Sequence, residues 1–418
     1  MQTPPNRHSS LTVWLEHLLS IHPTEIDMGL ARVSEVAASM GLLSLGQTKI
    51  VTVAGTNGKG TTCAMIEAVM MQAGWSVGVY SSPHLLQYNE RVRINGNDAS
   101  DQAFIEAFCA IDQARGAISL TFFEYATLAA LYIFKQQKLD LVILEVGLGG
   151  RLDATNMIDA DVSVITSIDI DHQEYLGDTR ELVGREKAGI FRASRPAIVG
   201  ERDLPQSVIQ VAREKGADLI LVGQAFDYVK HENGWDFQGQ TFSMNGLPLP
   251  TLPLPNGATA LAVVEHLLPG ISQELVAAGL RAAKLNGRLE QVSLQPTILL
   301  DVAHNPHAAK YLRQSLAPYK GKRIFALCGM LKDKDYSEVI SILGDVMTQW
   351  YFTSLDCQRS AAADDLLACL EGKGNGFAFD TLRQAYDALA AKICDDDVVI
   401  VFGSFYTVAE FKQLVLKE

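Results

Sequence analysis

The sequence predicts an α/β protein with a large N-terminal domain built on a mostly parallel sheet and a smaller C-terminal Rossmann-like domain. Apolar segments of strand length alternate with amphipathic helical segments along most of the chain, an order typical of parallel sheets covered by helices. A second alternating series begins near residue 297. The chain has 418 residues, more than one hydrophobic core usually spans, so we expect two domains.

The first half of the chain supplies the strands and helices of the larger domain. We expect strands at residues 49–54, 76–80, 140–145, 162–168 and 197–200, and helices at 61–73, 101–115 and 124–137. The polar, aromatic-containing stretch 226–242 predicts a hairpin that turns at Asn233-Gly234. Prolines between residues 247 and 256 are expected to interrupt regular structure before a helix from about 258 to 268.

The second half repeats the alternation. We expect its strands at residues 297–301, 323–328, 350–353 and 398–402. A helical pattern stops at the turn residues Asn286-Gly287, which is typical of a boundary between domains. The predicted domains are therefore residues 1–285 and 286–418.

Composition excludes several classes of protein. Hydrophobic residues make up 48% and charged residues 20%, values typical of a globular chain, and the apolar runs are far shorter than the roughly 20 residues of a membrane span. A net charge of −13 argues against a nucleic-acid partner. Six scattered cysteines without metal spacing favour a reducing compartment. We expect a cytoplasmic enzyme for small molecules, with a monomer as the default.

The strongest local signal is the segment 51–62, VTVAGTNGKGTT. A strand runs into a glycine-rich turn that opens a helix, so backbone N–H groups can surround phosphates. Lys59 would supply positive charge and Thr61 a hydroxyl toward a metal. The match is imperfect, because Val53 replaces the first glycine of the common motif and Gly60 follows the lysine. The alternative is an incidental glycine-rich turn between a strand and a helix. We predict a P-loop-type domain instead.

Three later side chains are suited to a magnesium ion at the same edge of the sheet. Glu145 ends one predicted strand, His172 follows the next, and Ser82 follows the strand at 76–80. Oxygen ligands at the carboxyl ends of neighbouring parallel strands fit Mg²⁺. Each residue also has an ordinary interpretation: Glu145 as a helix cap or surface residue, His172 as a satisfied polar residue, and Ser82 as the stop of a strand.

Other polar residues are ambiguous from the residues alone. Lys187 lies among small and apolar residues in REKAGIF, and a surface lysine near a helix end is the favoured interpretation. Asp301, His304 and Asn305 follow a buried strand within five positions, which suits a nucleoside or phosphate better than a random loop. Arg288 follows Gly287 and would, by itself, be a solvated arginine.

Together these segments resemble the folylpolyglutamate synthase family, a branch of the Mur-type ATP-dependent amide ligases, and most closely its bifunctional bacterial members. The resemblance extends from the start of the chain to about Phe405. It rests on six segments in the family's order: AGTNGKGTT, YSSPHLLQYNERVRING, LTFFEYATLAAL, LEVGLGGRLDATN, DHQEYLG followed by REKAGIFR, and LDVAHNPHAA.

The resemblance implies ATP and two Mg²⁺ ions as cofactors, and it assigns residues to them. ATP contacts are implied at Gly58, Lys59, Gly60, Thr61, Asn256, Arg288, Asp301 and His304, and magnesium ligands at Ser82, Glu145 and His172. Lys187 is implied to carry an N6-carboxylate and to act in catalysis with Lys59 and His172, which replaces the surface interpretation. A dihydropteroate pocket is implied at Met28, Gly29, Leu30, Ala31, Thr121, Phe122, Phe123, Glu124, Leu152, Asp153 and Ala154. Tyr406 stands where close relatives commonly have histidine.

The implied activity is the ATP-dependent addition of L-glutamate through an acyl phosphate. Dihydropteroate would give dihydrofolate, and the terminal γ-carboxylate of reduced folates would give folylpolyglutamates, with the smaller domain completing the ATP and glutamate sites. The alternatives are a single-function folylpolyglutamate synthase, a P-loop switch ATPase whose second domain binds a macromolecule, and a Mur enzyme for cell-wall precursors. The segment LTFFEYATL argues against the last, because it matches a pterin pocket.

Overall fold

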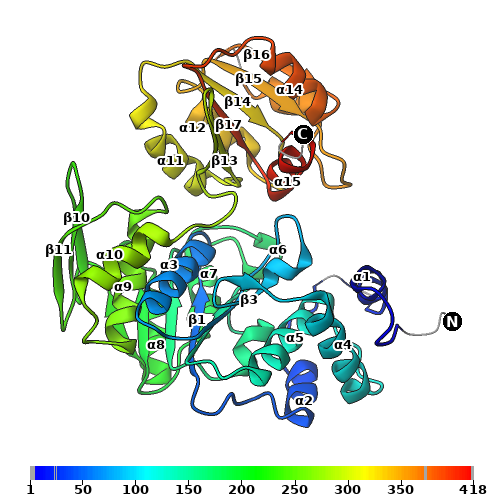
Figure 1. Cartoon of the computed structure of the whole chain (residues 1–418), viewed down its shortest axis with the longest axis vertical. Helices are drawn as coiled ribbons and strands as arrows, with labels where there is room; N and C mark the ends of the chain where they lie inside the picture. Colours follow the sequence, from blue (N-terminus) through cyan, green and yellow to red (C-terminus); the bar gives the residue numbers. More distant parts are fainter. Residues whose placement is uncertain (1–4, 23, 25, 371–373, 416–418) are drawn as a thin grey trace. The chain divides into compact units, whose positions relative to one another are not determined.

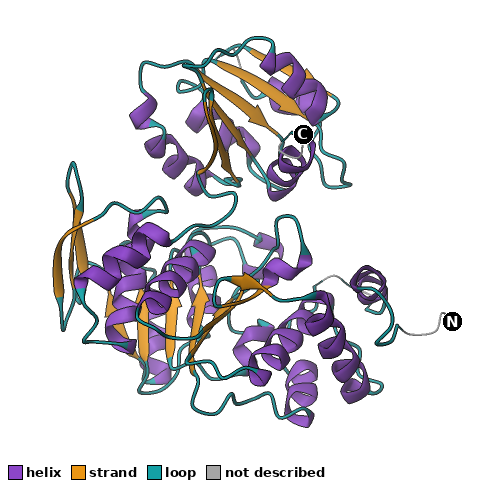
Figure 2. Ribbon diagram, viewed as in Figure 1, coloured by secondary structure: helices purple, strands orange, loops and turns teal. Residues whose placement is uncertain are grey.

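The chain forms two compact units, residues 1–284 and residues 285–418 (Figure 1). The computed structural model describes residues 5–22, 24, 26–370 and 374–415. Each unit contains its own sheet with helices on both faces (Figure 2), which confirms the predicted α/β class with a parallel-rich larger domain. Among the described residues, no helix is long and apolar enough to cross a membrane.

The sheet of the first unit has eight strands in the order β4-β3-β2-β5-β1-β6-β7-β8. The six strands from β2 to β8 in this order run parallel, whereas β3 pairs antiparallel with both β2 and β4. The strands are β1 Lys49–Ala54, β2 Val77–Tyr80, β3 Val92–Ile94, β4 Asn97–Asp98, β5 Leu141–Glu145, β6 Val162–Ile165, β7 Pro196–Val199 and β8 Asp218–Leu221. The carboxyl ends of β2, β5, β1 and β6 therefore meet at one edge of the sheet.

Alternation along the strands assigns the helices to the two faces, because side chains two positions apart share a face. Val142 and Leu144 of β5, and Val146 directly after it, pack into the cores that contain α5, α7 and α8. Helix α3 contacts β1, β2 and β5 and packs on α9 and α10, with α9 also on β7. The bounds are α3 Lys59–Gln72, α5 Phe122–Gln136, α7 Arg180–Ala188, α8 Gln206–Lys215, α9 Leu254–Leu267 and α10 Gln273–Ala282.

Shorter and peripheral elements complete the first unit. Helices α1 and α2 pack against α4 and α5 (Figure 1), and their side chains extend the core on the α5 side of the sheet. The remaining bounds are α1 Leu11–Ser20, α2 Ala31–Ser39, α4 Asp101–Arg115, α6 Gln173–Leu176, and the 3₁₀ turns η1 Tyr88–Arg91 and η2 Ala154–Met157.

The predicted hairpin forms, but it belongs to a three-stranded sheet. β9 Asp227–Lys230 and β10 Trp235–Gln238 are joined through Asn233-Gly234, and β11 Ser243–Leu247 pairs with β10. The expectation of irregular structure up to residue 258 is wrong, because α9 already begins at Leu254 with Pro255 in its first turn. Proline is tolerated there, since the first N–H groups of a helix have no partner within it.

The second unit has a six-stranded sheet in the order β12-β13-β17-β14-β15-β16, in which only β12 is antiparallel among the described strands. Its core joins one face of this sheet to α11, α12 and α13, and α14 and α15 contact the strands as well (Figure 1). This confirms the predicted Rossmann-like arrangement. The bounds are β12 Glu290–Leu294, β13 Thr297–Asp301, β14 Ile324–Cys328, β15 Gln349–Thr353, β16 Gly376–Phe379, β17 Val398–Phe402, α11 Pro306–Ser315, η3 Ala317–Tyr319, α12 Tyr336–Leu343, α13 Ala363–Ala368, α14 Leu382–Ala390 and α15 Phe405–Leu414.

We expect Gly279→Ala to destabilise the first unit, although alanine is the better helix former by about 1 kcal/mol. Helix α10 approaches α3 so closely that a Cβ atom on Gly279 would lie 2.5 Å from Cα of Val69. Overpacking of this kind costs about 1–3 kcal/mol, so the urea midpoint should fall. Gly270→Ala is the control, because its Cβ would meet nothing within 4 Å. Equal midpoints for the two variants would contradict this account of the packing.

Candidate active site

The turn between β1 and α3 is fixed by residues that follow β6. Thr166 donates a hydrogen bond from Oγ1 to the carbonyl oxygen of Asn57 (2.6 Å), and Ser167 Oγ accepts from the Asn57 N–H (3.1 Å). Thr56 Oγ1 donates to the carbonyl of Asp169 (2.9 Å). The chain leaves β6 at Ile165 and not at the predicted residue 168, because these residues bond to the turn. The turn is therefore shaped by the protein itself.

Two glycines in the turn allow backbone positions that a side chain would prevent. Gly58 has φ +84°, and a Cβ atom there would lie 2.7 Å from the side chain of Asn256. A Cβ atom on Gly55 would lie 1.9 Å from Thr166 Oγ1. Asn256 Nδ2 in turn donates to Thr61 Oγ1 (2.7 Å). The structure thus brings Asn256 of α9 to the first turn of α3, where backbone N–H groups and the helix dipole favour an anion.

Lys59 places its ammonium group over this turn. Its Nζ donates to the carbonyl oxygens of Gly55 (2.8 Å) and Thr56 (3.4 Å). The side chain is half-buried. A positive charge therefore lies beside the backbone N–H groups at the start of α3.

Glu145 and Ser82 lie side by side at the same edge of the sheet. β5 pairs with β1 on one side and β2 on the other, and the register sets Glu145 opposite Val53. Glu145 is only 6% exposed, so its interpretation as a surface residue is wrong. Its Oε2 accepts a hydrogen bond from the backbone N–H of Ser82 (3.3 Å). A carboxylate and a hydroxyl-bearing residue from two neighbouring strand ends are therefore in contact.

This pair fits Mg²⁺ that shares its coordination shell with a phosphate ligand. In the part of the chain that the structure describes, no three His, Cys, Asp or Glu side chains form a group that could hold a metal ion by themselves. Mg²⁺ usually takes one or two protein carboxylates and completes its shell with substrate phosphates and water. The donor set agrees with that pattern and not with an all-protein metal centre.

His172 lies on an exposed turn beyond the end of β6. It is the N-cap of the four-residue helix α6, with φ +51°, and its backbone N–H donates to Asp171 Oδ1 (2.9 Å). The described residues include no group of three metal-ligand side chains to which it belongs. The prediction that His172 and Glu145 share a metal ion therefore stays a prediction.

Lys187 is buried near the end of α7, with 3% of its surface exposed, so the surface interpretation is wrong. Burial, strengthened by the Lys59 ammonium group, lowers the pKa of Lys187 to about 7, and the carboxylates of Asp171 and Asp153 oppose this shift. Among the described residues, no hydrogen bond or ion pair compensates its ammonium group. The neutral amine is therefore well populated near neutral pH.

Asp153 organises the glycine-rich loop between β5 and η2. Its carboxylate accepts hydrogen bonds from the N–H groups of Gly147 (3.0 Å), Leu148 (2.9 Å) and Thr155 (3.0 Å), and from Thr155 Oγ1 (2.6 Å). Burial raises the pKa of Asp153, and these hydrogen bonds partly offset the shift. The loop lies directly on α7, since a Cβ atom on Gly150 would be 3.0 Å from the carbonyl oxygen of Lys187.

The three segments predicted to bind dihydropteroate lie at the starts of three elements that pack against one another. Helices α2 and α5 and the turn η2 are in mutual contact. Thr121 and Glu124 form a capping box at the start of α5, and Arg32 of α2 donates to Glu124 Oε1 (3.2 Å). A Cβ atom on Gly147 would lie 2.5 Å from the ring of Phe123. The set of predicted residues is Met28, Gly29, Leu30, Ala31, Thr121, Phe122, Phe123, Glu124, Leu152, Asp153 and Ala154.

Arg32 is a residue that the sequence analysis missed. It pairs with Asp27 (2.6 Å) as well as with Glu124, so it links the segment before α2 to the start of α5. Glu124 is 3% exposed, and a buried carboxylate normally needs a partner of opposite charge. That requirement was the available signal, but it does not identify which arginine supplies the charge.

In the second unit, Arg288, Asp301 and His304 gather at the carboxyl end of β13. Asp301 accepts hydrogen bonds from the N–H groups of Leu289 (2.9 Å) and Ala303 (2.8 Å). Burial raises the pKa of Asp301, although Arg288 acts in the opposite direction. Arg288 lies over the ring of Phe405, 5.1 Å from its centre. His304 donates from Nδ1 to the carbonyl of Val302 (2.8 Å), because a carbonyl can only accept.

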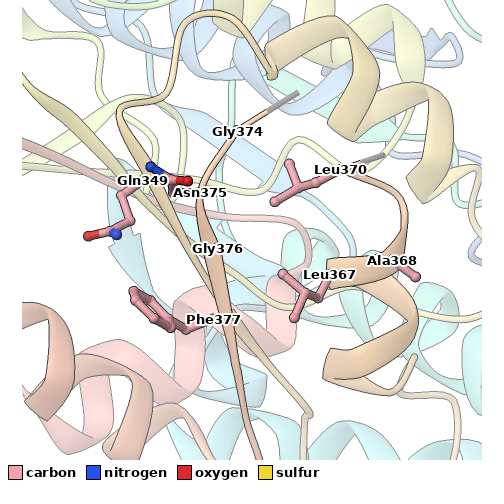
Figure 3. Close-up of a pocket in the computed structure, with 8 residues that line it drawn as sticks. All are labelled: Gln349, Leu367, Ala368, Leu370, Gly374, Asn375, Gly376 and Phe377. Atoms are coloured by element: carbon pink, nitrogen blue, oxygen red, sulfur yellow. The ribbon is translucent and has the colours of Figure 1, made fainter. Parts of the chain in front are cut away.

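A separate hollow in the second unit lies at the other edge of its sheet (Figure 3). Gln349 and Gly376, which line it, are the first residues of β15 and β16. The predicted nucleotide residues instead follow the carboxyl end of β13. None of the predicted site residues lines this hollow, whose lining is Gln349, Leu367, Ala368, Leu370, Gly374, Asn375, Gly376 and Phe377.

Comparison with known proteins agrees with this geometry. The Mur ligase middle domain matches residues 53–246, and the Mur ligase glutamate ligase domain matches residues 287–405. The dihydrofolate synthase/folylpolyglutamate synthase of Escherichia coli is 49% identical over 98% of this chain and 97% of its own length. The chain belongs to the dihydrofolate synthase/folylpolyglutamate synthase family of Mur ligases. The Haemophilus influenzae member is 42% identical over 97% of this chain and 98% of its own length.

Solved structures of this family have the same fold over nearly the whole chain. The E. coli FolC enzyme in complex with DHPP and ADP has a TM-score of 0.96 at 48% identity, covering 99% of each chain. A bifunctional folylpolyglutamate synthase/dihydrofolate synthase with Mn, AMPPNP and L-glutamate bound has a TM-score of 0.93 at 47% identity, covering 99% of this chain and all of its own. Family membership confirms the resemblance drawn from the six sequence segments.

We expect Lys187→Met to stabilise the protein without metal or carbon dioxide, and the gain to depend on pH. The folded-state pKa of Lys187 is about 7, below the unfolded value of about 10.4. The wild-type protein thus bears the full cost of the buried charge below about pH 7, and the cost disappears as the pH rises toward about 10.

The gain of Lys187→Met in unfolding free energy should be on the order of a few kcal/mol near pH 6.5 and small near pH 10. Urea unfolding in decarbonated, EDTA-containing buffer measures it at both pH values. Lys138→Met is the control, because Lys138 is exposed and its replacement should show no such trend. A pH-independent gain for Lys187→Met would contradict the burial of a charge.

Proposed function

We propose that the protein is an ATP-dependent ligase that joins L-glutamate to dihydropteroate and to the terminal γ-carboxylate of folates. The observation that supports this most is the gathering of a phosphate-type turn, the Glu145–Ser82 pair and buried Lys187 around one sheet edge of the first unit. Relatives that match nearly its full length are named for both reactions. Its free cysteines suit a reducing compartment, and we place its activity in the cytoplasm.

The first step activates a carboxylate, which is a poor acyl donor. A carboxylate oxygen of the substrate attacks the γ-phosphorus of ATP, and the bond between this phosphorus and the β–γ bridging oxygen breaks. ADP is the leaving group, and the substrate becomes an acyl phosphate. Lys59 and the N–H groups of Gly60 and Thr61 face the charge that spreads over the transferring phosphoryl group. When bound, Mg²⁺ neutralises phosphate charge. Ser82, Glu145 and His172 would hold it.

The second step forms the amide. The neutral amine of L-glutamate attacks the acyl carbon and loses a proton, and the tetrahedral intermediate collapses with release of phosphate. The substrate pocket we propose for dihydropteroate and folates lies at the starts of α2, α5 and η2, three elements that are in mutual contact. Helix α5 starts with a capping box and an arginine partner, so the pocket is built on fixed elements that orient the carboxylate.

The second unit would supply the rest of the nucleotide site and the glutamate site. Its match to the Mur ligase glutamate ligase domain supports this assignment. Arg288 offers N–H donors and His304 an imidazole ring near the buried Asp301 carboxylate, a set suited to the base, ribose or phosphates of ATP. Tyr406, which is 50% exposed near the start of α15, is our candidate for a contact with glutamate.

Lys187 is proposed to carry an N6-carboxylate. Carbon dioxide adds to the neutral amine: the nitrogen bonds to the carbon of CO₂ and releases one proton, leaving an anionic carbamate. A pKa of about 7 makes that neutral amine available. Unmodified, the ammonium groups of Lys187 and Lys59 repel each other, which is one cause of the lowered pKa. The carbamate turns this repulsion into attraction.

The direct test is ADP release by the purified protein with ATP, Mg²⁺ and L-glutamate. We expect release that requires glutamate and that appears with dihydropteroate and, separately, with a reduced folate, with amide products of the corresponding mass. Activity with folates alone would reduce the protein to a folylpolyglutamate synthase. ATP hydrolysis that is indifferent to glutamate would favour a P-loop switch ATPase.

We expect Lys187→Ala to lose most of the ligase activity, because the carbamate is lost with the amine. Short carboxylic acids should restore part of it by occupying the vacated carboxylate position. Lys187→Arg should stay inactive, since arginine remains cationic and cannot be carbamylated. Lys138→Ala is the control on an exposed lysine. A fully active Lys187→Arg enzyme would rule out the modification.

A further inference from the structure

A buried ion pair lies next to the proposed metal site and has no role in the reaction described above. Arg93 of β3 donates from Nη2 (2.8 Å) and Nε (3.3 Å) to Oε2 of Glu67 in α3. The side chains are 15% and 8% exposed. Oε1 of Glu67 is buried and has no hydrogen-bond partner among the residues that the structure describes. Removing both charges from water costs free energy that their attraction offsets only in part. Stability alone therefore gives little reason for a buried ion pair at this place.

The third contact of Arg93 leads to the metal site. Its Nη1 donates to Oγ of Ser81 (3.3 Å). Ser81 is also held by its backbone N–H, which donates to the carbonyl of Arg91 (2.9 Å). The next residue, Ser82, donates its backbone N–H to Glu145 (3.3 Å). One chain of contacts thus runs from α3 through Arg93 and Ser81 to the two residues that we propose as metal ligands. Here we call residues 81 and 82 the serine corner.

The charges around Arg93 also connect the ion pair with the proposed metal site. Burial by itself would lower the pKa of Arg93, but Glu67 outweighs it and Glu145 adds to the rise, so the pKa is raised. Burial and the carboxylates of Glu145 and Glu67 raise the pKa of Cys63, which keeps that thiol protonated. Arg93 is thus a cation that lies in the field of both carboxylates. Without it, two buried anions would repel each other near the serine corner.

We propose that Arg93 and Glu67 are positioning residues for the divalent cation: through Ser81 they hold the serine corner where Ser82 and Glu145 can bind one ion. The inference rests on the metal site of the proposed function. Because Glu67 belongs to the same helix as Lys59 and Thr61, the pair also ties the phosphate-binding turn to the metal ligands. Partners of metal ligands typically change metal affinity about 10–100-fold when removed.

The test measures Mn²⁺ binding directly, by loss of the free Mn²⁺ signal in electron paramagnetic resonance with ADP present. Ser81→Ala is the decisive variant, because it removes the hydrogen bond from Arg93 Nη1 and leaves the buried ion pair intact. It also removes the long hydrogen bond from Ser81 Oγ to the carbonyl of Glu90 (3.4 Å). Arg93→Met removes the cation, and Arg93→Lys keeps the charge with fewer donors. The matched control is Arg115→Met, which breaks a similar ion pair with Asp112 (2.5 Å) on α4.

We expect Ser81→Ala and Arg93→Met to weaken Mn²⁺ binding by about tenfold. The Mn²⁺ affinity of Arg93→Lys should lie between that of these variants and that of wild type. Arg115→Met should bind Mn²⁺ as tightly as wild type. In ligase assays the Mg²⁺ requirement should rise by a similar factor, while the turnover rate at saturating Mg²⁺ stays near wild type. A role in folding alone would lower the unfolding midpoint without changing the metal requirement.

Wild-type Mn²⁺ affinity in both Ser81→Ala and Arg93→Met would overturn the inference while leaving the proposed function intact. Glu145→Gln separates the two ideas. If Glu145→Gln binds Mn²⁺ as tightly as wild type, the metal site itself is wrong, and the positioning role is overturned with it.

Discussion

The parallel pairing of β2, β5, β1 and β6 is the constraint on which the candidate site depends. Because β5 is hydrogen-bonded between β1 and β2, and β6 lies on the other side of β1, four chain segments leave the sheet side by side. The register that sets Glu145 opposite Val53 decides how far each segment extends past the sheet. A shift of one residue would turn the Glu145 side chain to the other face of the sheet.

The sequence predicted this architecture well where burial is strong. Strands β1, β13 and β17 have the predicted bounds, because their side chains are almost all buried and periodicity reports burial directly. It failed where a strand lies at an edge or is half-exposed. β12, with no buried residue, carries no such pattern. It also failed at α9, where proline was taken as a helix breaker although Pro255 occupies the first turn.

The site was predictable in its main-chain parts and less so in its side-chain partners. The glycine-rich turn and the residues at strand ends follow from local sequence, and the structure brings the turn, Glu145 and Ser82 to one edge. Lys187 was ambiguous, since a lysine near a helix end is usually exposed and its burial depends on the loop at Gly150 that covers α7. Partners far apart in sequence, such as Arg32 with Glu124 or Arg93 with Glu67, leave no local pattern.

The hydrogen bond between Asn256 and Thr61 joins residues 195 positions apart. During synthesis the first turn of α3 can form as soon as β1 and β6 have paired, but this partner exists only after residue 256 has left the ribosome. Contacts between distant parts of a chain also form late in folding, because closing a long loop costs entropy before the contact is gained. A nascent or truncated chain that ends before α9 therefore has the glycine-rich turn but lacks Asn256, its hydrogen-bond partner. The new chain should become able to bind nucleotide only late in its synthesis.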